Sequence, residues 1–121
     1  MSKHTKGPWF TSQPHQTIYI EARIGGGLLQ EVAAIGPTEG GPLQQSANAR
    51  LIAAAPDLLE ACQTFAEWLR REDAGFVKAG NSRETPEGEA EWRAWFLENM
   101  RICALAQDQA RAAIAKATEA A

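Results

Sequence analysis

The chain has 121 residues, of which 45% are hydrophobic, and this is the size and apolar content of one ordinary globular domain over residues 1–121. Its formal net charge of −3 argues against a general nucleic-acid binder, because such a protein needs a basic surface to displace counterions. The sequence contains no run of 18 apolar residues and no hydrophobic leader, so we expect a soluble cytoplasmic protein with no membrane partner.

The N-terminal part of the chain predicts a small antiparallel β-sheet over about residues 9–36. Residues 17–24 and 28–35 are rich in β-branched side chains and partly alternate, which is typical of strands. The three glycines 25–27 between them predict a hairpin turn. Since an isolated hairpin is barely stable in water, we expect the segment that begins at Trp9 to pair as a further strand.

A central helix is predicted from about residue 46 to 72, after a glycine- and proline-rich loop over 36–45. Ser46 is placed to cap its start. Pro56 interrupts it and allows two outcomes: the helix bends at Pro56, or it ends near Ala54 and a second helix begins with Pro56 at its first position. The bend is favoured because the apolar positions keep their helical spacing on both sides of the proline. These positions are Leu51, Ile52, Ala55, Leu58, Leu59, Cys62, Phe65 and Leu69.

A last helix is predicted over about residues 86–118. Thr85 is placed to cap it, with Pro86 at its first position. The preceding loop covers 73–84, and within it Phe76 and Val77 are expected to pack back onto the core. The predicted fold class is therefore α+β: an antiparallel sheet of two to four strands, followed by two long antiparallel helices within a helical region over about 46–118.

The composition of the last helix predicts self-association. Its C-terminal half has an alanine seam from Ala106 to Ala117, and alanine buries little area within one small subunit. We therefore expect a homo-oligomer formed through this helix. Cys62 and Cys103 are expected to be small buried hydrophobes with free thiols, and most aromatic side chains are expected in the core.

Templates for catalysis and for metal binding fail on this sequence. The two cysteines are isolated, and His4 and His15 have neither metal-ligand spacing nor a carboxylate at a fixed offset. The glycines 25–27 lead into a strand, so they cannot offer a phosphate the N-terminus of a helix. The sequence therefore predicts no catalytic residue, no metal, no cofactor and no enzymatic activity.

Three residues are candidates for ligand binding. Helical spacing places Asn48 over Ile52 on the apolar face, where its amide needs hydrogen-bond partners; it either ties down the preceding loop, which is favoured, or contacts a ligand. Arg50 points away from this face and is either a solvated charge, which is favoured, or a partner for phosphate or carboxylate. Trp9 is expected nearby and able to stack on a base.

The run ANARLIAAAPDLLEAC at 47–62, with HTKGPW at 4–9 and ARAAIAKAT at 110–118, resembles a family of small phage and prophage proteins. Their pattern is an N-terminal T-x-G-P-W, a short β segment, a central ANARLIAAAPELLEAL and a final helix. The resemblance implies phage origin and an accessory role in the cytoplasm of an infected bacterium, and it supplies no catalytic residue.

Two functions from different classes follow as hypotheses. The first is an anti-defence protein that binds and sequesters a nucleotide-derived immune signal, through arginines and surplus aromatic side chains. The alternative is a non-enzymatic interaction module that binds a host protein through a tryptophan-rich surface. An arginine and an aromatic side chain meeting in a pocket would favour the first, and a flat apolar patch without such a pocket the second.

Overall fold

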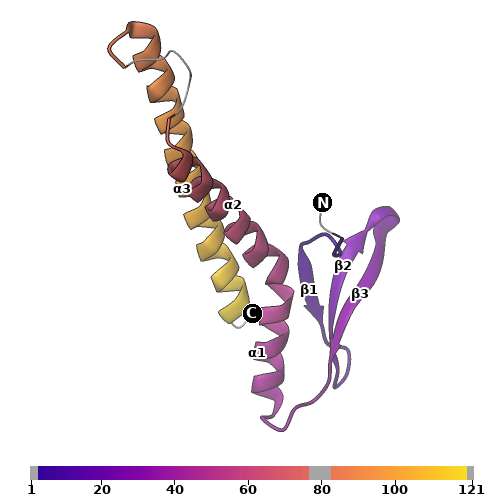
Figure 1. Ribbon diagram of the computed structural model, residues 1–121. Coiled ribbons are helices and arrows are strands. Elements are labelled where there is room, and N and C mark those ends of the chain that lie inside the picture. Colours follow the sequence, from indigo (N-terminus) through magenta and orange to yellow (C-terminus); the bar gives the residue numbers. More distant parts are fainter. Residues whose placement is uncertain (1–2, 77–82, 120–121) are drawn as a thin grey trace.

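The computed structural model describes residues 3–76 and 83–119, and over these ranges the fold is α+β, as predicted (Figure 1). A three-stranded sheet comes first and three α-helices follow it. In chain order the elements are β1 (Trp9–Ser12), β2 (Ile18–Ile24), a 3-10 turn (Gly25–Gly27), β3 (Leu28–Ile35), α1 (Pro42–Ala53), α2 (Ala55–Ala74) and α3 (Pro86–Thr118).

The sheet is antiparallel in the order β1-β2-β3, which confirms both the hairpin and the third strand beginning at Trp9. Gly26 and Gly27 have φ angles of 76° and 74°, a region that side chains disfavour, so glycines are needed at this turn. The inward-facing side chains of β2 are buried, and they are Ile18, Ile20 and Ala22. This face of the sheet packs on α1.

Helix α1 begins four residues earlier than the sequence predicts. Gly41 precedes the first turn with a φ of 87°, and Pro42 occupies the first helical position. The predicted loop is therefore wrong over 42–45, and Ser46 lies inside the helix instead of capping it. Within this extra turn Gln45 is 4% exposed, and its Nε2 donates to the carbonyls of Gln16 at 2.7 Å and Ile35 at 2.8 Å.

The favoured bend at Pro56 is replaced by a boundary between two helices. Helix α1 ends at Ala53, Ala54 lies between the helices, and α2 begins at Ala55 with Pro56 at its second position. The backbone N–H of Ala54 donates to the carbonyl of Arg50, so the boundary is tight. Proline cannot donate in this turn, and α2 leaves α1 in a new direction (Figure 1). The architecture thus has three helices where the sequence predicts two long ones.

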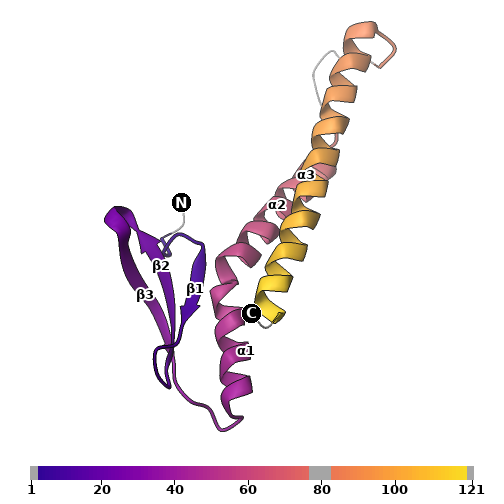
Figure 2. The ribbon, with the colours of Figure 1, turned by 180° about the vertical axis from the view of Figure 1, so that it is seen from behind.

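Helices α2 and α3 form a long antiparallel hairpin that extends beyond the sheet and α1 (Figures 1 and 2). The predicted start of α3 is confirmed, because the Thr85 hydroxyl accepts a hydrogen bond from the N–H of Gly88 at 3.0 Å. Phe76 packs on Trp95, with 6.0 Å between ring centroids. Val77 lies outside the described residues. None of the described helices is long and apolar enough to cross a membrane.

Candidate functional site

The N-terminal T-x-G-P-W segment packs against the junction of α1 and α2. The indole Nε1 of Trp9 donates to the carbonyl of Thr5 at 3.0 Å and closes the segment on itself. Gly7 lies so close to Pro56 that a Cβ added to Gly7 would lie 2.8 Å from the Pro56 Cβ. The first motif of the resemblance thus contacts the proline of the central motif, and both motifs stabilise one corner of the fold.

Trp9 and Arg50 lie together on a cavity of about 490 Å³. The cavity is bounded by β1 and the chain leading into it, by α1, and by the C-terminal end of α3. Its lining residues are Pro8, Trp9, Phe10, Thr11, Arg50, Ala53, Ala115, Lys116 and Glu119. We call this the Arg50 cavity. The sequence placed Trp9 near the helix that carries Arg50, but it gave no signal that α3 completes the cavity.

The charges around the Arg50 cavity are only partly neutralised. The Arg50 side chain is half-buried, and its Nε is shielded from solvent with no hydrogen-bond partner among the described residues. Lys116 donates to the carboxylate of Asp57 at 2.8 Å, whereas Glu119 brings a negative charge to the rim. The cavity therefore offers an N–H donor and an aromatic ring beside an acceptor.

Asn48 does not belong to this cavity, and its predicted placement on the apolar face is wrong. Its side chain is exposed, while the buried positions of α1 are Gln45, Ala49 and Ala53, each four residues apart. The large apolar residues of this stretch predict a different buried face. In the structure small alanines make the closest approach to β2, and Leu51 is left 55% exposed.

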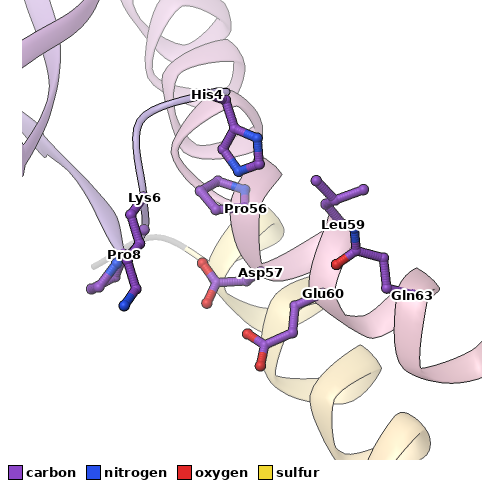
Figure 3. A pocket seen from close by; sticks show the side chains of 9 residues that line it. His4, Lys6, Pro8, Pro56, Asp57, Leu59, Glu60 and Gln63 are labelled. Atoms are coloured by element: carbon purple, nitrogen blue, oxygen red, sulfur yellow. The ribbon is translucent and has the colours of Figure 1, made fainter. Parts of the chain in front are cut away.

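A second cavity of about 710 Å³ lies between the N-terminal segment and the start of α2 (Figure 3). It mixes the side chains of His4 and Lys6 with the carboxylates of Asp57 and Glu60. Since Asp57 is already paired with Lys116, this mixture favours no single ligand charge. Among the residues that the structure describes, no group of three or more His, Cys, Asp or Glu is placed to hold a metal ion.

A family model described as Salmonella phage P22 protein Y8K6 matches residues 1–121 of the chain. The chain belongs to this phage protein family. The match agrees with the phage resemblance of the sequence, and its description names no activity. No curated protein and no solved structure matches the chain.

In this member of the Y8K6 family a third cavity, of about 560 Å³, lies along one side of the α2–α3 hairpin. Its lining is almost entirely apolar: Leu58, Ala61, Cys62, Phe65, Trp68, Cys103, Ala106, Gln107, Ala110 and Ile114. The expectation of buried cysteines is wrong, because Cys62 is exposed and Cys103 is only half-buried here.

The aromatic side chains of the hairpin also lie nearer the surface than the sequence predicts. Phe65 is 49% exposed and stacks on Trp68 at 5.7 Å between ring centroids, and Phe96 is 41% exposed and stacks on Trp92 at 5.2 Å. A two-helix hairpin has too little depth to enclose rings of this size. The aromatics form a surface instead of a core.

Proposed function

We propose that this phage protein binds and sequesters a small nucleotide-derived signalling molecule of the host's antiviral defence, without catalysing a reaction. The observation that carries the proposal is the Arg50 cavity, whose lining combines the half-buried side chain of Arg50 with the ring of Trp9. Its volume of about 490 Å³ falls within the range of small-molecule sites. A phosphate or a polarised carbonyl of the ligand would accept from Arg50, and a base would stack on the indole.

The affinity expected from these groups can be bounded. Stacking contributes about 1–3 kcal/mol per base, and a hydrogen bond to a charged group about 1.5–3 kcal/mol. Together they supply about 2.5–6 kcal/mol, whereas a micromolar dissociation constant requires about 8.2 kcal/mol. A micromolar ligand must therefore also contact Phe10 or Lys116. Glu119 on the rim favours a ligand that carries donors, such as ribose hydroxyls or a base amine.

Calorimetry against cyclic dinucleotides, cyclic trinucleotides and cyclic ADP-ribose isomers tests the proposal. Arg50→Ala should weaken the binding of any ligand that gives heat by at least about tenfold, the equivalent of about 1.4 kcal/mol, because the guanidinium is the main donor of the cavity. Two controls should bind like the unmodified protein. Asn48→Ala changes an exposed side chain of the same helix, and Arg111→Ala removes an exposed arginine of α3.

Absence of heat with every compound of the panel would contradict the proposal. The alternative is a module that binds a host protein, and the exposed apolar side of the hairpin is the observation that favours it. Recovery of one host protein in a pull-down, combined with no heat in calorimetry, would support this alternative. Binding of a host protein there requires that the apolar side of the hairpin is exposed in solution. A second copy of the chain that covers this side would prevent it.

A further inference from the structure

One side of the hairpin carries an apolar stripe from each helix, and we call the two stripes together the apolar face. On α2 it consists of Leu58, Cys62, Phe65 and Leu69, and on α3 of Phe96, Met100, Cys103, Gln107, Ala110 and Ile114. Consecutive members of the stripe are four, three and four residues apart on α2, and alternately four and three residues apart on α3. This is the heptad spacing of helices that pack side by side over their length. Seven of these ten residues from the two helices line one common cavity, so the stripes are adjacent in space.

Packing within the chain uses a different stripe of α3. The buried residues of this inner stripe are Asn99, Ile102, Ala106, Ala113 and Ala117. The apolar face is offset from it by one residue, as Cys103, Gln107 and Ile114 follow Ile102, Ala106 and Ala113. Helix α3 thus has two neighbouring stripes of the same period, and α2 occupies one of them. A helix with two such stripes is typical of a bundle of more than two helices.

This arrangement corrects the physical reason for the predicted homo-oligomer. The sequence assigned the seam from Ala106 to Ala117 to contacts between subunits, but Ala106, Ala113 and Ala117 are buried within the chain. Of the alanines at this spacing, Ala110 alone belongs to the apolar face. The contact surface therefore has to be the neighbouring stripe with its larger side chains.

No other described element covers the apolar face. The sheet packs on α1, and the hairpin extends past both (Figures 1 and 2). Ile114 and Met100 are each 55% exposed, and Phe65 is 49% exposed. Solvent exposure of so many large apolar side chains on one surface marks an interaction site.

The charges around the apolar face fit a second copy of the same chain. The face contains no charged residue, and three ion pairs near it each lie within a single helix. Arg70 donates to Glu67 at 2.6 Å, Arg101 donates to Glu98 at 2.6 Å, and Asp108 pairs with Arg111 at 3.4 Å. The hydrogen bonds from Arg70 and Arg101 lower the pKa of Glu67 and of Glu98, so both carboxylates stay ionised. Two copies that meet through this face would therefore bring no like charges of the face together.

The shape and the size of the face also suit a twofold pair. The cavity lining combines the small side chains of Ala61, Cys62, Cys103 and Ala110 with the larger ones of Phe65 and Ile114. In a twofold pair the larger side chains of each copy can pack against the small side chains of the other. At 1.5 Å per residue the α3 stripe is about 27 Å long and the α2 stripe about 16 Å long, and at about 10 Å of width per helix they cover about 430 Å² in projection. The corrugated accessible surface is larger than this projection, and a stable interface takes about 800 Å² from each partner.

We infer that the apolar face binds a second copy of this chain, so that two hairpins form an antiparallel four-helix bundle. The Arg50 cavity stays open in such a dimer. Ile114 belongs to the apolar face and Lys116 to the cavity, and two residues of separation place them about 200° apart around α3. The inference does not rest on the proposed function, because ligand binding and self-association use different sides of α3.

Sedimentation velocity of the full chain at about 1–100 µM tests the inference, the range in which an interface worth about 8 kcal/mol is occupied. We expect a dimer of twice the 13.1 kDa chain mass. Ile114→Glu should shift it to monomer, weakening association by at least about a hundredfold, since it buries two unpaired carboxylates. Ala112→Glu is the matched control: the same residue is introduced two positions away, at an exposed site outside the face, and the dimer should persist.

Circular dichroism confirms that each variant is folded. If Ile114→Glu fails to fold, Met100→Glu replaces it, because Met100 is equally exposed within one chain and belongs to the same face. A monomer at 100 µM would overturn the inference, and so would a dimer unchanged by both glutamates of the face. A monomer that captures a host protein through this face, with capture lost in Ile114→Glu, would also overturn it and would support the interaction module.

Discussion

At the scale of single residues, the two motifs of the phage resemblance have a structural explanation. Gly7 contacts Pro56, and Trp9 is held by the carbonyl of Thr5, so the N-terminal segment is fixed at the point where α1 gives way to α2. A glycine is needed at position 7 because the proline ring occupies the space of a side chain. The motif therefore positions Trp9 on the Arg50 cavity.

Gly7→Ala should lower the free energy of unfolding by about 1–3 kcal/mol, the usual cost of overpacking a filled site. Its new Cβ would lie 2.8 Å from the Pro56 Cβ. Gly36→Ala is the control, because a Cβ there meets nothing within 4 Å and the φ angle needs no glycine; it should leave stability unchanged or raise it by about 0.4–1 kcal/mol. Urea denaturation measures both, and equal midpoints for the two variants would contradict the packing argument.

Gln45 is a second residue whose role is structural. Its amide donates to one carbonyl before β2 and to another at the end of β3, so it ties the sheet to α1. Gln45→Ala should cost about 1–3 kcal/mol of unfolding free energy, since two part-buried hydrogen bonds from a buried amide are lost. Gln44→Ala removes the same side chain from an exposed neighbouring position and should have little effect. Equal thermal unfolding temperatures for the two variants would contradict this role of Gln45 in joining the sheet to α1.

At the scale of elements, the α2–α3 hairpin depends on one buried polar residue. Asn99 is 2% exposed on the inner stripe of α3, accepts a hydrogen bond from Arg71 and donates to Glu72 at 2.9 Å. Such a residue fixes the register of two helices, because a shift along the axis would leave its amide unpaired. The exposed ion pairs Arg70–Glu67, Arg101–Glu98 and Arg111–Asp108 cannot do this, as each lies within a single helix.

Asn99→Ala should therefore lower the unfolding free energy by about 1–3 kcal/mol, because the hydrogen bonds of the buried amide to Arg71 and Glu72 are lost. Asp108→Ala removes an exposed ion pair from the same helix and should cost about 0–1 kcal/mol. Denaturant titrations of the two variants give the comparison. A loss for Asn99→Ala no larger than that for Asp108→Ala would show that the register is set elsewhere.

The elements that the sequence predicts well are those with local signals. Three glycines mark the hairpin turn, and Thr85 with Pro86 marks the start of α3. The errors arise where packing between distant segments decides. The start of α1 depends on carbonyls that Gln45 meets only after the sheet has formed, and the buried face of α1 is chosen by alanines that carry little signal. The same choice of buried face leaves Asn48 in solvent, while Trp9 and Arg50 line one cavity.

At the scale of the whole molecule, the two proposed interactions use different surfaces. The sheet, α1 and the N-terminal segment enclose the Arg50 cavity together with the last turns of α3. The apolar face runs along another side of the α2–α3 hairpin and begins at Leu58, in the first turns of α2. Ligand binding and self-association are thus assigned to separate surfaces, and Arg50→Ala and Ile114→Glu should each affect one of them.

The distribution of the four tryptophans follows this division. Trp9 is held against Thr5 at the edge of the Arg50 cavity, while Trp68, Trp92 and Trp95 belong to the hairpin. Replacing the three hairpin tryptophans by phenylalanine leaves one indole whose emission comes from the cavity alone. The complementary variant, Trp9→Phe, confines emission to the hairpin. The molecule thus contains its own fluorescent labels, one for a ligand that enters and another for a partner that docks.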